Sequence, residues 1–78
     1  MEFYELAKLI GEVINVPAYK IRREQFLKKD LGADSLDVFQ IVIRLEEETG
    51  SSISPADAEM LRTVGDLAEM AERISRKH

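Results

Sequence analysis

The sequence predicts an all-α fold, a small four-helix bundle with a long first loop and a short third helix. Apolar residues recur at steps of three and four in three segments, which is the spacing of one helix face. Capping residues separate these segments, such as Gly50 after the second and Ser54-Pro55 before a short extra helix. No stretch shows the alternation expected of a strand. A chain of 78 residues is expected to form one domain, spanning 1–78.

The first helix is predicted from the apolar spacing near the N-terminus. Glu2 and Glu5 fall in its first turn, where acidic side chains favour the positive end of the helix dipole. Asn15 and Pro17 end it. Gly11 costs about 1 kcal/mol relative to alanine. A close helix contact is one interpretation of this glycine, and simple tolerance is the one we favour. The apolar face consists of Phe3, Leu6, Ile10, Val13 and Ile14.

Residues 15–33 form the long first loop. A structureless stretch of this length is unusual in a compact domain. We therefore expect a short helical turn after Pro17, and we expect the apolar residues of the loop to hold it against the core. These anchors are Val16, Tyr19, Ile21, Phe26, Leu27 and Leu31.

The other three helices are predicted from their caps. The second opens at Asp34 or Ser35 and runs to about Thr49, with Gly50 as its C-terminal cap. The short third helix follows Ser54, and the fourth opens at Thr63-Val64-Gly65-Asp66. The fourth helix has an apolar face of Val64, Leu67, Ala71 and Ile74 and a basic end of Arg73, Arg76 and Lys77.

The composition argues against several classes of function. Without cysteine the chain has no disulfide, no thiolate metal site and no thiol nucleophile. A net charge of −4 argues against a nucleic-acid binder. No apolar run exceeds three residues, so we expect no membrane insertion. The N-terminus is acidic, unlike a signal peptide, and we expect a cytoplasmic protein.

No catalytic constellation is evident in the sequence. The single histidine, His78, is the last residue and is expected to be frayed, so no serine has a histidine to activate it. No motif joins a nucleophile, a base and an oxyanion site. We therefore do not expect an enzyme.

The second helix has two apolar stripes where a small bundle needs one for its core. One stripe contains Val38, Ile41, Val42 and Leu45, and the other contains Leu36, Phe39 and Ile43. The second stripe is therefore either buried by neighbouring helices or shown to a partner. Gln40 and Glu47 flank it, and an apolar strip with a polar rim is typical of a docking surface.

The residues that open this helix read Leu31-Gly32-Ala33-Asp34-Ser35-Leu36-Asp37, and here the chain resembles the acyl carrier protein family. That family is marked by Asp-Ser-Leu at the start of its second helix, after a leucine-glycine turn. Glu46-Glu47-Glu48 near the end of the second helix and Thr63-Val64 at the start of the last add to the resemblance. It covers almost the whole chain.

The resemblance implies that Ser35 receives 4′-phosphopantetheine from coenzyme A through a phosphopantetheinyl transferase, with Asp34 and Leu36 beside it in the cofactor-binding motif. A phosphodiester at a helix N-terminus meets free backbone N–H groups and the positive end of the dipole. The arm ends in a thiol that holds an acyl group as a thioester, so the sulfur comes from the cofactor. The alternative from the residues alone is that Ser35 is only an N-cap, although Asp34 caps equally well.

The same resemblance implies two further sets of residues. Partner enzymes would dock on Leu36, Phe39 and Ile43, inside an acidic rim of Asp34, Asp37, Glu46 and Glu47. The acyl chain would lie among Leu45, Ile53, Ala58 and Leu61, for which an ordinary core role is an equal alternative. Expected partners are acyl-transferring or condensing enzymes with basic docking surfaces, acting on a monomer. Two carboxylates alone make a poor cation site, so we expect no metal.

Three departures from the family pattern indicate partners that differ from those of the general fatty-acid pathway. The segment 26–32 is one residue longer than the usual Phe-x-acid-Leu-Gly, so Phe26 or Leu27 takes the anchor position, and two lysines follow where the family commonly has acidic residues. Gln40 and Arg44 replace a usual glutamate and a usual small residue, and the segment 54–61 is less acidic than the usual third helix.

The leading hypothesis is a carrier for fatty-acid or related acyl and lipid synthesis. Two alternatives stay open. One is a dedicated carrier of a polyketide, a specialised lipid or an activated amino acid. The other, from a different class, is an unmodified protein-interaction bundle.

The charge is unevenly distributed along the chain. Residues 30–60 hold eight acidic residues and one basic residue, a net −7, whereas residues 1–29 carry +2 and residues 61–78 carry +1. The acidic segment includes Ser35 and the second helix, so it is expected to steer basic partner surfaces toward Ser35. The long loop is basic through Lys20, Arg22, Arg23, Lys28 and Lys29.

Overall fold

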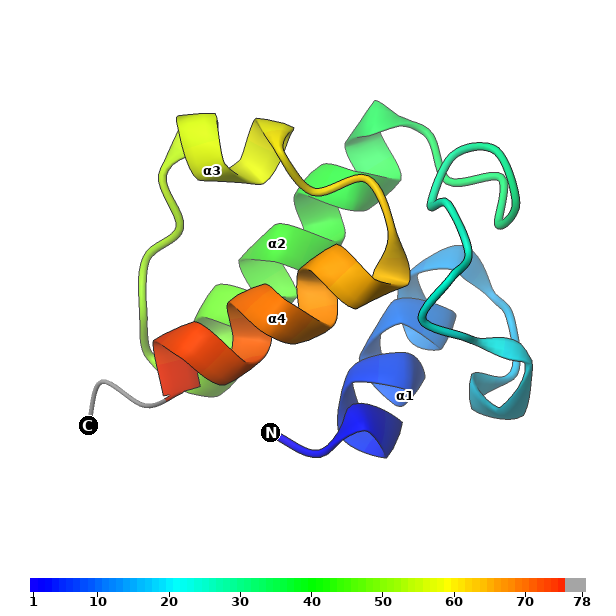
Figure 1. Ribbon diagram of the computed structural model, residues 1–78, viewed down its shortest axis with the longest axis horizontal. Coiled ribbons are helices and arrows are strands. Elements are labelled where there is room, and N and C mark those ends of the chain that lie inside the picture. Colours follow the sequence, from blue (N-terminus) through cyan, green and yellow to red (C-terminus); the bar gives the residue numbers. More distant parts are fainter. Residues whose placement is uncertain (76–78) are drawn as a thin grey trace.

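A computed structural model describes residues 1–75 and confirms the all-α prediction (Figure 1). The helices are α1 (Phe3–Ile14), α2 (Ser35–Thr49), α3 (Pro55–Glu59) and α4 (Val64–Ser75), and a 3-10 turn, η1 (Ala18–Lys20), follows Pro17. Within the described residues the only extended pairing is an isolated antiparallel bridge between Phe26 and Thr63. The predicted basic residues Arg76 and Lys77, and the predicted fraying of His78, lie outside the described part of the chain.

Local capping explains where the helices begin and end. The backbone N–H of Glu2 donates to Glu5 Oε1 at 2.9 Å at the start of α1. Asn15 ends that helix in the left-handed region at φ 62°, a conformation that asparagine adopts more readily than most residues. Gly50 ends α2 in the same way at φ 71°. The predicted ends of both helices are confirmed.

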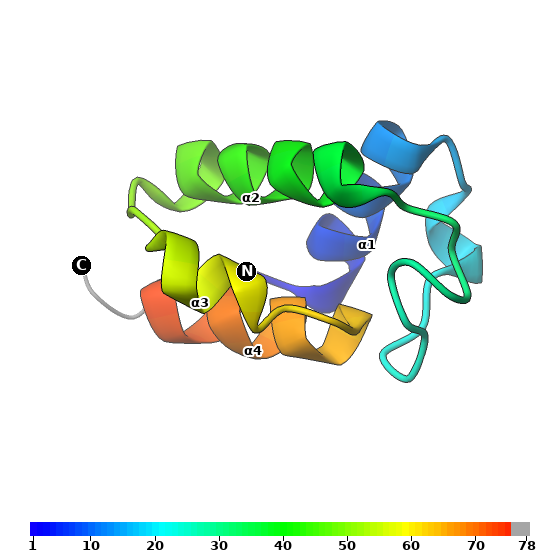
Figure 2. The ribbon, with the colours of Figure 1, turned by 90° about the horizontal axis from the view of Figure 1, so that it is seen from above.

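The helices enclose one core. Helices α2 and α4 lie roughly side by side and run in the same direction, and α1 packs against both (Figures 1 and 2). Helix α3 lies on the path that returns from the end of α2 to the start of α4 (Figure 1). The seven largest fully buried side chains come from α1, α2, α4 and the long loop. They are Leu6, Ile10, Leu27, Ile41, Leu45, Val64 and Leu67.

Gly11 is required by a close contact, so its interpretation as merely tolerated is wrong. After α1 the chain turns back on the helix, and the backbone N–H of Val16 donates to the carbonyl oxygen of Gly11 at 3.0 Å. A Cβ at position 11 would lie 2.2 Å from the carbonyl oxygen of Val16, which is closer than real Cβ atoms approach an oxygen. The absence of a side chain therefore lets the chain reverse tightly at the end of α1.

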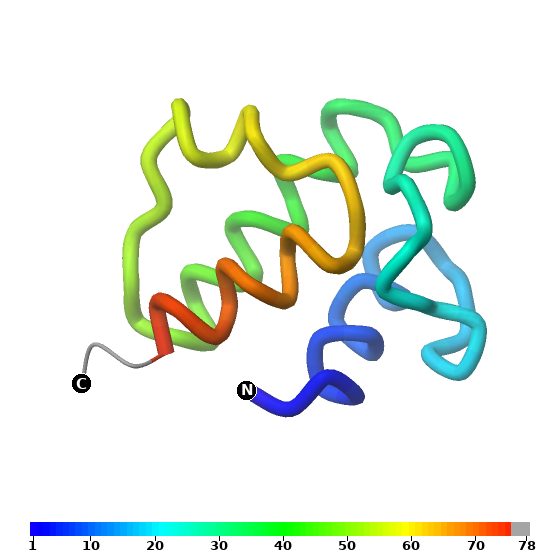
Figure 3. The backbone as a smooth tube through the Cα atoms, viewed as in Figure 1, coloured from blue at the N-terminus to red at the C-terminus, as the bar shows by residue number. Residues whose placement is uncertain are grey.

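The long loop is folded at the end of the bundle where α2 and α4 begin (Figure 3). Three backbone hydrogen bonds join it to the start of α4 and the residue two positions before it. Leu27 N–H donates to Arg62 O at 2.9 Å, Val64 N–H to Gln25 O at 3.0 Å, and Gly65 N–H to Arg23 O at 2.9 Å. Midway along the loop, the Arg23 guanidinium lies over the ring of Phe3, 5.0 Å from the centroid. The loop is therefore tied to both α1 and α4.

Not every predicted anchor of the loop is buried. Ile21 and Leu27 are buried, and Val16 and Leu31 are half-buried, as predicted. Tyr19 is 78% exposed and Phe26 is 46% exposed, so for these two the prediction is wrong. Residues three apart share a face in a 3-10 turn, and here that inner face belongs to Ala18 and Ile21 rather than Tyr19. At the Phe26–Thr63 bridge, neighbouring side chains point to opposite sides and Leu27 takes the inner one.

Candidate functional site

The first turn of α2 is capped by Asp34, not by Ser35. Asp37 N–H donates to Asp34 Oδ1 at 2.8 Å, and Asp34 N–H donates to Asp37 Oδ2 at 3.2 Å. This reciprocal pair satisfies backbone groups that have no partner within the helix. Ser35 is the first helical residue, is exposed, and does not use its hydroxyl to cap the helix. The alternative that Ser35 serves as the N-cap is therefore excluded.

The turn before α2 brings a cation to this hydroxyl. Lys28 Nζ lies 3.4 Å from Ser35 Oγ and donates to it. The turn is held on both sides of Lys28: Ala33 N–H donates to Leu27 O at 2.8 Å, and Phe26 N–H donates to Asp30 Oδ2 at 2.7 Å. Leu27 itself is only 1% exposed. Lys28 is thus carried on a turn whose position is fixed by the core.

A pocket of about 490 Å³ opens beside Ser35, between the loop, α2 and the segment from α3 to α4. Its walls are largely apolar, and its charged lining residues are Lys28, Lys29, Glu59 and Arg62. The apolar and aromatic lining residues are Phe26, Leu27, Val38, Phe39, Val42, Ala58 and Leu61.

The pocket includes only part of the predicted acyl-binding set. Ala58 and Leu61 line it, whereas Leu45 and Ile53 do not and are buried in the core at 0% and 8% exposure. Val38 and Val42 also line the pocket, and they were not predicted to do so because they belong to the stripe assigned to the core. Their spacing offered a signal, since residues three and seven after Ser35 lie on the same side of a helix as Ser35.

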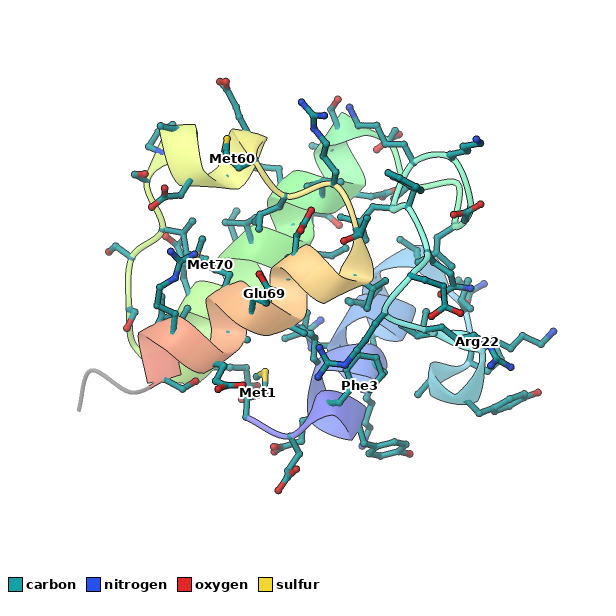
Figure 4. The ribbon with its side chains drawn as sticks, in the orientation of Figure 1. Met1, Phe3, Arg22, Met60, Glu69 and Met70 are labelled. Atoms are coloured by element: carbon teal, nitrogen blue, oxygen red, sulfur yellow. The ribbon has the colours of Figure 1, made fainter. Side chains whose placement is uncertain are left out.

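The two apolar stripes of α2 have different environments. Ile41, Val42 and Leu45 are buried and Val38 is half-buried, so this stripe packs inward. The other stripe faces solvent: Leu36 is 64% exposed, Phe39 59% and Ile43 38%. We call these three residues the exposed stripe. Met60, just after α3, adds another exposed apolar side chain at 73% (Figure 4).

The predicted acidic rim divides into free and bonded carboxylates. Asp34 and Asp37 make the cap of α2, and Glu46 Oε2 accepts a hydrogen bond of 2.7 Å from Ile53 N–H, which ties α2 to the chain before α3. Glu47 is exposed. In residues 1–75 no group of three or more histidine, cysteine or acidic side chains is arranged to hold a metal ion.

Arg44 forms an ion pair within the domain. Its guanidinium donates to Glu12 Oε1 at 2.6 Å, an ion pair between α2 and α1. The hydrogen bond from Arg44 holds the pKa of Glu12 below its ordinary value, and the same bond raises the pKa of Arg44. This departure from the family pattern therefore serves contacts between helices.

Comparison with known proteins shows which family has this arrangement. A family model described as a phosphopantetheine attachment site matches residues 5–71. The acyl carrier protein of Helicobacter pylori is 40% identical over 70 residues, which cover 90% of each chain.

Two solved structures agree with these matches. A structure from Mycobacterium tuberculosis that carries an acyl carrier protein assignment superposes with a TM-score of 0.85 at 33% identity, covering 92% of this chain and 97% of its own. The acyl carrier protein of Enterococcus faecalis gives a TM-score of 0.72 at 33% identity, covering 97% of this chain and 92% of its own.

The fold and these matches define a carrier domain that bears a phosphopantetheine arm. The chain belongs to the acyl carrier protein family. It is a carrier and not an enzyme, and its cofactor is 4′-phosphopantetheine. Members of this family interact with a phosphopantetheinyl transferase and with biosynthetic enzymes. No helix among the described residues is long and apolar enough to cross a membrane.

Proposed function

We propose that Ser35 is the residue that receives 4′-phosphopantetheine, and that the chain carries acyl groups for fatty-acid or related acyl and lipid biosynthesis. The observation that supports this most is that Asp34, and not Ser35, provides the N-cap of α2. Asp34 caps α2, so the Ser35 hydroxyl is left exposed at the pocket. At the start of α3 the roles differ, because Ser54 Oγ itself accepts the capping bond from Asp57 N–H at 3.1 Å.

The surroundings of Ser35 fit a phosphopantetheine arm. The Ser35 oxygen forms the ester bond, the start of α2 offers backbone N–H groups and a positive dipole end, and Lys28 Nζ lies 3.4 Å away. When attached, the cofactor supplies a thiol that holds the acyl group as a thioester. Val38, Val42, Ala58 and Leu61 offer an apolar wall close to Ser35 for the carried group.

The exposed stripe is the surface we assign to partner enzymes. Leu36, Phe39 and Ile43 begin one residue after Ser35, so a partner that covers them also faces the arm. The net −7 of residues 30–60, including exposed Glu47, favours partners with basic docking surfaces. Three further points remain predictions from the sequence: the 78 residues form one domain, the protein acts as a monomer, and it is cytoplasmic.

A dedicated carrier of a polyketide, a specialised lipid or an activated amino acid is the second candidate. It is favoured by two cations, Lys28 and Lys29, that line the pocket in the segment where the family commonly has acidic residues. The unmodified interaction bundle is set aside, because the match to the phosphopantetheine attachment family spans residues 5–71.

The attachment proposal is tested by intact mass. The apo protein is incubated with coenzyme A and a broad-specificity phosphopantetheinyl transferase, together with the Ser35→Ala variant and a matched Ser52→Ala control at an exposed serine. We expect a gain of one phosphopantetheinyl group in the wild type and in Ser52→Ala, and no gain in Ser35→Ala. A gain in Ser35→Ala would show that another residue carries the arm.

The pathway is tested on the loaded protein. It is offered malonyl-coenzyme A with a malonyl transferase, or an amino acid with ATP and an adenylating enzyme. Malonyl loading supports fatty-acid or polyketide synthesis, and loading only by the adenylating route supports a dedicated aminoacyl carrier.

A further inference from the structure

We propose that Lys28 binds the phosphodiester that joins the arm to the protein, and that it thereby holds the root of the arm over the apolar pocket. The inference rests on the proposed attachment at Ser35. It assigns a specific role to a residue outside the Asp34-Ser35-Leu36 motif. The supporting observations are the contact between Lys28 and Ser35, the fixed turn and the charges around it.

The geometry places the cation where the phosphate oxygens must lie. Lys28 Nζ is 3.4 Å from Ser35 Oγ, and the phosphorus of the arm is bonded directly to that oxygen. The ammonium group therefore reaches a non-bridging phosphate oxygen without movement of the backbone. A hydrogen bond between an ammonium and a phosphate is charge-assisted and stronger than one between neutral groups.

The backbone of Lys28 is held in place, although its side chain is exposed. Leu27 N–H donates to Arg62 O at 2.9 Å, and Gly32 N–H donates to Lys28 O at 3.2 Å. Leu27 is buried beneath the turn. The backbone that carries the Lys28 ammonium group is consequently held near Ser35 by contacts with the rest of the domain.

The charges around Ser35 favour a cation at this position. The arm introduces a negative charge one residue after Asp34 and two residues before Asp37, within the acidic segment 30–60. Within residues 1–75, Lys28 forms no ion pair, whereas Arg44 is paired with Glu12. An unpaired cation therefore lies beside the position of the new anion. The pocket lining adds two further cations, Lys29 and Arg62, against one acidic residue, Glu59.

This contact gives the arm a resting position. With its phosphate on Lys28, the arm starts at the pocket lined by Val38 and Val42.

The test compares the effect of the arm on stability in variants with and without Lys28. Wild type, Lys28→Gln and the matched control Lys20→Gln, a loop cation that does not line the pocket, are each prepared as apo and fully loaded proteins. Loading is driven to completion and verified by intact mass. Melting temperatures are then measured by circular dichroism at low salt, and the ³¹P resonance of each loaded protein is recorded.

For each protein, the effect of the arm is the melting temperature of the loaded form minus that of the apo form. We expect this difference to be about 2–5 °C more negative in Lys28→Gln than in the wild type and Lys20→Gln. The ³¹P resonance should move only in Lys28→Gln, and 1 M salt should remove the difference in melting temperature because the screening length falls to about 3 Å. Complete loading with equal arm effects and equal ³¹P resonances in all three proteins overturns the role of Lys28 alone. Absence of loading in the wild type overturns the attachment at Ser35, and this inference with it.

Discussion

Asp34 and Asp37 cap the start of α2 reciprocally, each backbone N–H donating to the carboxylate of the other residue, at 2.8 and 3.2 Å. The residue between the cap and the exposed stripe is Ser35, whose hydroxyl is thereby spared for other chemistry. One local motif thus both starts the helix and presents the serine. The two aspartates have a structural role in addition to any contact with partners.

The cap predicts that Asp34→Ala destabilises the domain while Asp34→Asn does so much less. Loss of an N-cap side chain costs about 1 kcal/mol, which for a domain of this size lowers the melting temperature by about 4–8 °C. Asparagine keeps an oxygen that accepts the Asp37 N–H bond. Thermal unfolding followed by circular dichroism measures both variants. An Asp34→Ala protein as stable as the wild type would show that another group caps α2.

Much of the fold could be predicted because its signals are local. Gly50 ends α2, Ser54 and Pro55 start α3, and each acts within one turn of its own position. The second apolar stripe of α2 was also visible in the spacing, and its exposure follows once the first stripe fills the core.

The remaining features depend on contacts between distant segments. Whether Phe26 or Leu27 turns inward is decided by pairing with the chain at Arg62 and Thr63, far away in sequence. The same pairing carries Lys28 to Ser35 and forms one wall of the pocket. No periodicity within the loop contains that information.

Gly11 provides a second stability prediction. In an ordinary helix interior, alanine in place of glycine stabilises by roughly 0.5–1 kcal/mol. Here the new Cβ would meet the carbonyl oxygen of Val16 at 2.2 Å, so the turn after α1 must move. We expect Gly11→Ala to destabilise by about 1–3 kcal/mol in urea unfolding, whereas Lys8→Ala on the exposed side of α1 changes stability little. A Gly11→Ala protein more stable than the wild type would contradict the close contact.

The exposed stripe predicts separate effects on function and on folding. Phe39 is 59% exposed, so Phe39→Ala should leave helicity and the melting temperature nearly unchanged. It should slow loading by the transferase, or acyl transfer by a partner enzyme, about fivefold or more if it anchors the interface. Leu45, at 0% exposure, is the contrasting core position, and Leu45→Ala should cost about 2–5 kcal/mol of stability. Unfolding of Phe39→Ala would instead assign Phe39 to the core.

Asp66 predicts an acid-sensitive part of the stability. Its Oδ2 accepts hydrogen bonds from Arg62 N–H at 2.9 Å and Thr63 N–H at 3.0 Å, and these bonds, that from Arg62 foremost, lower the pKa of the carboxyl. A carboxyl whose pKa is lower in the folded state than in the unfolded chain stabilises the fold above its unfolded pKa. That contribution is lost as the pH falls through the folded pKa.

We therefore expect the Asp66→Asn variant to be less stable than the wild type at pH 7 and to approach it in acid. The difference arises because the amide loses the charge that strengthens both bonds while retaining one acceptor oxygen. Urea unfolding at a series of pH values from neutral into the acid range measures the two curves. Glu69→Gln, an exposed substitution on α4 that likewise removes one carboxylate, is the control for the change in net charge (Figure 4). Parallel curves for wild type and Asp66→Asn would show that the Asp66 carboxylate contributes no pH-dependent stability, and that the turn joining the pocket wall to α4 is held by its other hydrogen bonds.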